Sequence, residues 1–287
     1  MKKVLQFLIK AIAGIIGKRN FEKLLIYSAK TINVNLYLHG LIQIGAQNSF
    51  DSAINGEELF IKKTLAGLLK TNAKPVFFDV GANIGDFSLE LRKQFPHAEI
   101  HSFEPVKTTY NLLEQATAGH QIQLHNIGFS NSMGKGELFN TVSKDNNTIA
   151  SAYKDVFQEI FKMDEELGII EFEMDTIDNF CVSNGIKNID FLKLDVEGHE
   201  FSVLQGAANM LLNKQVKIIQ FEFNSHNVHS RVFLRDFYLL LTGFEFYRIF
   251  QNGIIKLGPY SHLNEIFTLQ NIVAIRTELC DAVSSNP

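Results

Sequence analysis

The chain has 287 residues, of which 46% are hydrophobic and 25 are phenylalanine, enough for one large domain with a substantial core. Its formal net charge of −4 argues against a general nucleic-acid-binding protein. The two cysteines, Cys181 and Cys280, form neither a disulfide framework nor a zinc pattern, which is typical of reduced thiols in a cytoplasmic protein.

The first 20 residues predict an amphipathic helix. At about 100° per residue one face is apolar: Val4, Leu5, Leu8, Ile12, Ile15 and Ile16. The opposite face carries Lys3, Gln6, Lys10 and Gly17. No apolar run reaches the roughly 18 residues of a membrane span. Three interpretations stay open: a signal peptide, a helix lying at the inner membrane surface, or a helix packed on its own domain or on a partner subunit in a homodimer.

The rest of the chain predicts an α/β domain. Residues 1–70 are expected to form a helical N-terminal extension whose last helix, at 58–69, leads into the first strand of a domain at 71–280. Strands and helices then alternate, which predicts βαβ units and a parallel sheet covered on both faces. The predicted strands are 76–79, 99–103, 122–126, 191–195 and 216–222. The predicted helices are 86–94, 108–117, 200–212 and 230–241.

The C-terminal region breaks this alternation. Residues 244–250, 253–257 and 266–275 are strand-like runs without a long helix between them, so we expect antiparallel strands at one edge of the sheet. Residues 141–171 are polar and weakly patterned, apart from a short predicted helix at 156–166. We interpret them as an insertion near the ligand pocket.

The segment 75–105 predicts a strand, a glycine turn, a helix and a second strand. Asp79 ends the first strand, and Glu104, 25 residues later, ends the second. Ligands of open α/β sheets bind beyond the carboxyl ends of the strands, where an acid can accept hydrogen bonds from ribose hydroxyls. Between the two acids, Gly81 and Asn83 suit left-handed backbone, and Gly85 starts a helix whose free N–H groups point at the ligand. The pattern predicts a nucleoside site.

The turn reads DVGANIG and lacks the GxGxxG spacing that cradles a pyrophosphate. This disfavours a nicotinamide-dependent oxidoreductase. Acids in the turn region suit a ligand with a positively charged amino-acid portion, and S-adenosylmethionine fits both observations. Asn126, at the end of the third strand, is expected near the adenine.

A second motif, KLDVEGHE at 193–200, follows another apolar run. Asp195 and Glu197 should project into the cleft, where they and His199 are candidates for the base that removes a proton from a hydroxyl acceptor. Asp195 is also a candidate contact for the amino group of the cofactor. Glu222 and His226 follow the next strand and should converge on the same place. Lys193 is expected to be structural and to alternate away from Asp195, with pairing to a neighbouring carboxylate as the alternative.

Other interpretations of this motif stay open. A divalent metal bound by Asp195, Glu197 and Glu222 could position and acidify a hydroxyl pair, although the spacings are not diagnostic. Alternatively, Glu197 pairs with Lys193 or caps the following helix, and His199 is solvated.

The blocks FDVGANIGDFSL, IHSFEP, TIDNF and IDFLKLDVEGHEFSVLQGA together resemble the FkbM family of S-adenosylmethionine-dependent methyltransferases, over residues 56–275. The resemblance implies a Rossmann-like class I methyltransferase sheet with a reversed final strand. It also implies methyl transfer to an oxygen, often on a sugar or natural product. The contrasting hypothesis is a non-catalytic scaffold that keeps the cofactor fold and binds a membrane or partner.

Overall fold

A computed structural model describes residues 2–47, 55–141, 150–151 and 167–281. The chain divides into two compact units, Met1–Ile44 and Gly45–Pro287. The predicted domain boundary lay at residue 70. In the structure the boundary lies at residue 45, and the helical stretch that contains Phe60, Ile61 and Leu65 belongs to the second unit, because these side chains are buried in its core. The predicted short helix at 156–166 lies outside the described residues.

The first unit consists of helices α1 (Lys2–Ile16), α2 (Lys18–Thr31) and α3 (Leu36–Gln43). Gly17, with φ of 82°, separates the first two, and the side chain of Asn35 caps α3 by accepting from the backbone N–H of Leu38. Among the described helices of the chain, none is both long and apolar enough to cross a membrane.

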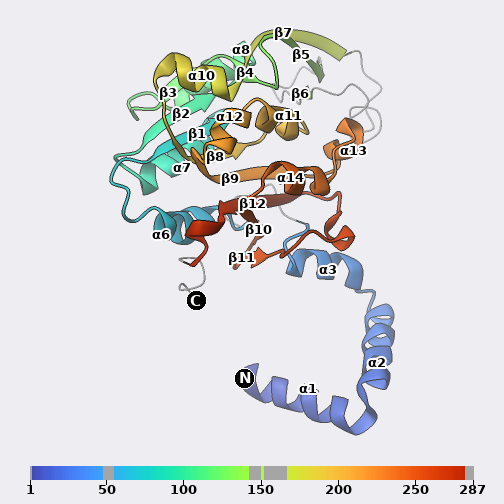
Figure 1. The fold of residues 1–287 in the computed structure, drawn as a ribbon. Coiled ribbons are helices and arrows are strands. Elements are labelled where there is room, and N and C mark those ends of the chain that lie inside the picture. Colours follow the sequence, from blue (N-terminus) through green and yellow to red (C-terminus); the bar gives the residue numbers. More distant parts are fainter. Residues whose placement is uncertain (1, 48–54, 142–149, 152–166, 282–287) are drawn as a thin grey trace. The chain divides into compact units, whose positions relative to one another are not determined.

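The second unit is built on an eight-stranded sheet (Figure 1). Its order is β11-β10-β12-β9-β8-β1-β2-β3. The strands are β1 (Val76–Val80), β2 (Glu99–Phe103), β3 (Gln123–His125), β8 (Ile189–Leu194), β9 (Val216–Phe223), β10 (Phe244–Phe250), β11 (Gly253–Lys256) and β12 (Gln270–Arg276). The first five pair in parallel, whereas β12 runs antiparallel to both of its neighbours, β9 and β10. This confirms the predicted Rossmann-like class I methyltransferase fold with a reversed final strand.

Helices cover both faces of this sheet (Figure 1). One core packs under α10 (Ile177–Asn184), α11 (Glu200–Gln205), α12 (Ala208–Leu212) and α14 (Leu234–Leu240). The other packs under α7 (Asp86–Gln94) and the continuous helical stretch α5 (Glu57–Leu59), η1 (Phe60–Leu65) and α6 (Ala66–Leu68). The helix α8 (Lys107–Ala116) buries Leu113. Phenylalanines fill much of both cores; the stacked pair Phe221 and Phe237 has ring centroids 4.2 Å apart.

Two predicted helices are shorter than expected. The predicted helix 200–212 divides at Gly206, where a Cβ would lie 2.1 Å from the carbonyl oxygen of Ser130, so this backbone packs against another segment. The predicted helix 230–241 begins only at Leu234, because Arg231 takes a left-handed φ of 56° at the end of a separate short helix, α13 (His226–Ser230).

A second sheet was not predicted. It pairs β4 (Gly128–Phe129), β7 (Leu167–Asp175), β5 (Gly134–Thr141) and β6 (Ala150–Ser151) in that order. The strand β7 begins inside the segment that we interpreted as an unpatterned insertion. Its side chains are only half-buried or exposed, so the apolar signal that marks a core strand is weak there.

Candidate functional site

The glycine turn follows β1 at the point where the sheet order reverses, between β1 and β8. This switch point is where open α/β sheets bind ligands. The backbone N–H groups of Gly81 and Ala82 both donate to the carbonyl oxygen of Phe103, at 3.0 and 2.9 Å, so β2 holds the turn. Asn83 takes the left-handed φ of 48° that the sequence analysis expected it to tolerate, and Gly85 has φ of 97°.

Gly81 cannot be replaced without cost. Its φ is 81°, and a Cβ at this position would lie 1.9 Å from the carbonyl oxygen of Asp195. The two predicted motifs are therefore in backbone contact, and the N–H of Asp195 also donates to the carbonyl oxygen of Val80 at 3.0 Å. The close approach fixes the distance between the turn and the second motif.

Glu104 is buried just beyond β2 and is held by backbone donors. Its Oε2 accepts from the N–H of Asn83 at 3.1 Å, and its Oε1 accepts from the N–H of Val106 at 2.9 Å. Burial raises the pKa of Glu104 to about 7, more than these two hydrogen bonds lower it. Each carboxylate oxygen has two lone pairs, so both can accept a further hydrogen bond from a ligand.

Asn126 lies beside Glu104, and its side chain binds the backbone. Its Nδ2 donates to the carbonyl oxygens of Glu104 and Pro105, at 2.8 and 2.9 Å. Asn126 thereby fixes the chain where it leaves β2, and its predicted position near the adenine stays a prediction.

A row of polar residues crosses the buried sheet beneath the turn. Ser102, Asp79, Lys193 and Gln220 are register partners on β2, β1, β8 and β9. Asp79 is fully buried, and its Oδ2 accepts from the Oγ of Ser88 on α7 at 2.5 Å. The Ser88 Oγ also lies 2.6 Å from the Oγ of Ser102. Asp79 therefore ties α7 to the sheet under the turn.

Lys193 was wrongly expected to alternate away from Asp195. Residues two apart on a strand share a face, and the Lys193 Nζ donates to Oδ2 of Asp195 at 2.9 Å while lying 4.0 Å from Oδ1 of Asp79. Burial alone would lower the pKa of Lys193, but the carboxylates of Asp195, Asp79 and Glu57 outweigh it and raise that pKa. Lys193 is therefore a buried cation at the centre of the site.

Glu57 and Gln220 belong to the same network. The Glu57 carboxylate accepts from Nδ2 of Asn55 at 2.7 Å and from Nε2 of Gln220 at 2.5 Å. Burial raises the pKa of Glu57, and the charge of Lys193 opposes this. The sequence signal for Gln220 was a polar residue at an inward position of an apolar strand.

In the loop after β8, the two predicted catalytic residues Glu197 and His199 have different partners. Glu197 has an unusual left-handed φ of 54°, and its half-exposed carboxylate lies 2.8 Å from Nδ1 of His226. Burial would lower the pKa of His226, but the hydrogen bond and charge of Glu197 raise it above its ordinary value. His199 instead places Nε2 2.9 Å from the Oγ of Ser130, and burial lowers its pKa.

Of the two remaining acids near this loop, Glu200 is buried and Glu222 is half-buried. Oε1 of Glu200 accepts from the N–H groups of Val196 and Gly198, at 3.1 and 3.2 Å, which stabilises the loop. Burial raises the pKa of Glu200 to about 7. Glu222 accepts from Nδ2 of Asn224 at 3.0 Å; burial, helped by the charges of Asp195 and Glu197, raises its pKa well above the ordinary value.

The candidate metal ligands do not form a metal centre. Among the described residues, no group of three or more His, Cys, Asp or Glu side chains is arranged to hold a metal ion. Asp195 binds the ammonium of Lys193, and Glu197 binds His226, so two of the three candidate acids are paired within the protein.

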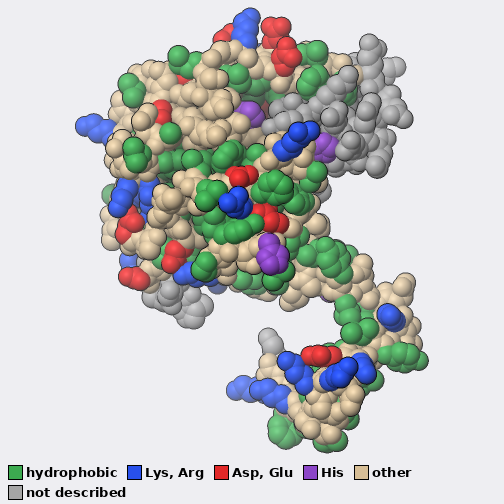
Figure 2. Space-filling model, turned by 45° about the vertical axis from the view of Figure 1, so that its right-hand side comes forward, with side chains coloured by type: hydrophobic (Ala, Val, Ile, Leu, Met, Phe, Trp, Pro, Cys, Tyr) green, Lys and Arg blue, Asp and Glu red, His purple; other side chains and the backbone are tan. Residues whose placement is uncertain are grey.

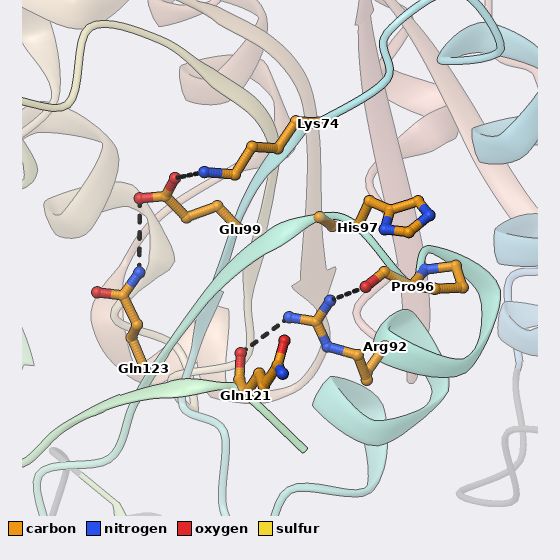
Figure 3. Close-up of a pocket in the computed structure, with 8 residues that line it drawn as sticks. Lys74, Arg92, Pro96, His97, Glu99, Gln121 and Gln123 are labelled. Atoms are coloured by element: carbon orange, nitrogen blue, oxygen red, sulfur yellow. Dashed lines mark hydrogen bonds and ion pairs between the residues drawn. The ribbon is translucent and has the colours of Figure 1, made fainter. Parts of the chain in front are cut away.

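Two surface hollows lie at the opposite, amino-terminal end of the parallel strands. The larger, of about 630 Å³, is lined by Lys74, Arg92, Glu99 and neighbouring residues, and the other, of about 390 Å³, lies beside Asp190. In the larger one the polar groups bind one another: Arg92 donates to the carbonyl oxygens of Pro96 and Gln121, and Lys74 pairs with Glu99 (Figure 3). The carboxylates and histidines that could act on a ligand lie instead at the carboxyl ends of the strands. We therefore place the candidate site there.

Comparison with known proteins identifies the family of the chain. Residues 79–246 match the methyltransferase FkbM domain family, more than half of the chain. The chain belongs to this family.

Methyltransferase sdnD of Sordaria araneosa is 27% identical over 157 residues, which are 47% of this chain and 61% of that protein. Methyltransferase 1 of Beauveria bassiana (strain ARSEF 2860) is 28% identical over 141 residues, 45% of this chain and 56% of that protein. The matches thus span between 56% and 61% of the length of these relatives. In structure, the chain is similar to a methyltransferase FkbM from Methylobacillus flagellatus KT, with 14% identity, a TM-score of 0.41 and coverage of 70% of this chain and 44% of that one.

Proposed function

We propose that this protein transfers the methyl group of S-adenosylmethionine to a hydroxyl group of a sugar, a glycan or a small natural product. The observation that supports the proposal best is the set of carboxylates around the Gly81 turn at the switch point of the sheet. Glu104, Asp195 and Glu57 surround a place whose only buried ammonium is Lys193 among the described residues. Such surroundings favour a cationic ligand and disfavour a diphosphate.

The residues fit the cofactor from both ends. Glu104, oriented by two backbone N–H groups, would accept hydrogen bonds from the ribose hydroxyls. Asp195, one third exposed, would hold the ammonium of the amino-acid portion beside the Gly81 turn, whose backbone contacts the backbone of Asp195. The cofactor supplies an electrophilic methyl group on a sulfonium, whose leaving group is a neutral thioether.

The acceptor side provides a base. We propose that His226 takes the proton of the acceptor hydroxyl as its oxygen bonds to the methyl carbon, and that the Glu197 carboxylate at 2.8 Å stabilises the resulting imidazolium. The hydrogen bond and charge of Glu197 raise the pKa of His226 and so make its imidazole a stronger base. Of the residues predicted as catalytic, Glu197 then acts through His226, Asp195 acts on the cofactor side, and His199 supports the loop through Ser130.

Two measurements test the proposal. Calorimetry with S-adenosylmethionine and with its demethylated product should show binding of both. In a screen of hydroxyl and amine acceptors, the enzyme should then release the demethylated cofactor in the presence of hydroxyl acceptors. His226→Asn should lower kcat about 10²- to 10⁴-fold without changing cofactor affinity. His97→Asn, at the opposite end of the sheet, is the matched control. Absence of cofactor binding in folded protein refutes the proposal, and transfer to amines alone refutes its hydroxyl specificity.

A further inference from the structure

The N-terminal unit exposes an unusual amount of apolar surface. More than half of the exposed large hydrophobic side chains in the described part of the chain lie before residue 45. On α1 these include Leu8, Ile12 and Ile15, of which Ile15 is 83% exposed. The remainder come from separate elements of the second unit, as expected for ordinary surface residues. Among the described residues, exposed large hydrophobic side chains are thus concentrated in α1 to α3.

Charge is distributed just as unevenly. Before residue 45 there are seven lysines or arginines and a single acid, Glu22, which gives a net charge of +6. Because the whole chain carries −4, the residues from 45 onward carry −10. Figure 2 shows basic side chains, hydrophobic side chains and one acidic side chain together on the N-terminal helices.

The separation of these two kinds of side chain is clearest on α1, where Lys3 and Lys10 lie opposite the face of Leu8 and Ile15. On α2, Arg19, Lys23 and Lys30 lie opposite Phe21 and Leu24, whereas Ile26 lies on the basic side. This arrangement has the two parts of an interfacial helix: an apolar face for the acyl region and cations for the headgroups. With 15 residues, α1 is about 22 Å long, less than the roughly 30 Å hydrocarbon core, so it suits lying in the membrane plane.

A second copy of the chain is a poorer occupant of this surface. Two copies of a unit with a charge of +6 repel each other, whereas an anionic bilayer attracts every one of these cations. We propose that helices α1 to α3 bind the surface of an anionic lipid bilayer, with the apolar face of α1 inserted and the lysines and arginines at the headgroups. This binding needs neither cofactor nor acceptor, so it stands or fails separately from the proposed methyl transfer.

Co-sedimentation of the full chain with vesicles tests the proposal. The chain should pellet with phosphatidylcholine vesicles that contain phosphatidylglycerol, and much less with phosphatidylcholine alone. Added salt should weaken binding, because screening reduces the attraction of the cations. The double variant Leu8→Glu/Ile15→Glu should bind at least about tenfold more weakly, since it places charge on the inserting face. Lys3→Glu/Lys10→Glu, which leaves the apolar face intact, should also weaken binding to anionic vesicles.

The matched control is Val182→Glu/Leu212→Glu, because these side chains of the second unit are 82% and 81% exposed but lie outside the N-terminal helices. It should bind vesicles like the unmodified chain. The proposal is overturned if the full chain stays in the supernatant with anionic vesicles, if it binds neutral vesicles equally well, or if the control loses as much binding as the helix variants. Light scattering that shows a dimer, dissociated by Leu8→Glu/Ile15→Glu, without vesicle binding would assign the surface to a second copy instead.

Discussion

The two halves of the candidate site are held by different means. At the ends of β1 and β2, backbone groups set the geometry: Phe103 accepts from the Gly81 turn, and two N–H groups orient Glu104. At the ends of β8 and β9, side chains bind side chains, as in Lys193 with Asp195 and Glu197 with His226. Geometry set by the backbone suits a ligand that does not vary, such as the proposed cofactor. Geometry set by side chains can be adapted to a different acceptor by a few substitutions.

The largest effect is expected at the contact between the halves. Gly81→Ala forces a Cβ against the carbonyl oxygen of Asp195 in a backbone region that disfavours alanine. We expect a loss of about 3 kcal/mol or more in the free energy of unfolding and of most cofactor affinity. Thermal melting and calorimetry measure the two losses.

Gly119→Ala is the control for Gly81→Ala, because Gly119 has φ of +82° but nothing within 4 Å of its Cβ position. It should cost only about 1 kcal/mol, from the backbone conformation alone. Equal losses in the free energy of unfolding of the two variants would show that the contact between the two motifs does not stabilise the fold.

An intermediate effect is expected at Glu104. Glu104→Gln should weaken binding of the demethylated cofactor about 10- to 100-fold, since it removes a charged acceptor from the ribose. Donors from the ligand favour the ionised carboxylate, and the pKa of Glu104 without ligand is about 7. Affinity should therefore rise with pH up to about 7 and level off above it, and this dependence should vanish in Glu104→Gln.

Exposed Glu114 on α8 provides the comparison for Glu104, and Glu114→Gln should keep both the affinity and its pH dependence. An unchanged pH profile in Glu104→Gln would remove Glu104 from the ribose site.

The smallest effect is expected from removing the charge of Glu197 beside His226. Glu197→Gln removes the charge that raises the pKa of His226 while burial, which lowers it, remains. The pKa of His226 should fall, as measured by NMR titration of the imidazole protons. His199, which bonds to Ser130, is the internal control and should keep its pKa. If both histidines shift equally, the pairing of Glu197 with His226 is wrong.

The fold was predictable where hydrophobic residues form short runs or recur with the period of a helix. Buried strands such as β1 and β9 read as short apolar runs, and their alternation with helices predicts a parallel sheet. The strands β5 and β7 escaped prediction because their side chains are only partly buried, which leaves little hydrophobic signal. The division of one predicted helix at Gly206 depends on a contact with Ser130, 76 positions earlier in the chain.

By itself, the sequence determined the parts that depend on neighbouring residues: the strand-turn-helix at Asp79 to Gly85, the acids at the strand ends, and the methyltransferase family. Only the tertiary structure decided which side chains meet. It brings Lys193 between Asp195 and Asp79, pairs Glu197 with His226, and turns His199 toward Ser130. The reason is physical: the strength and direction of a charge pair depend on burial and on distances of a few ångströms, which are set by the packing of distant segments.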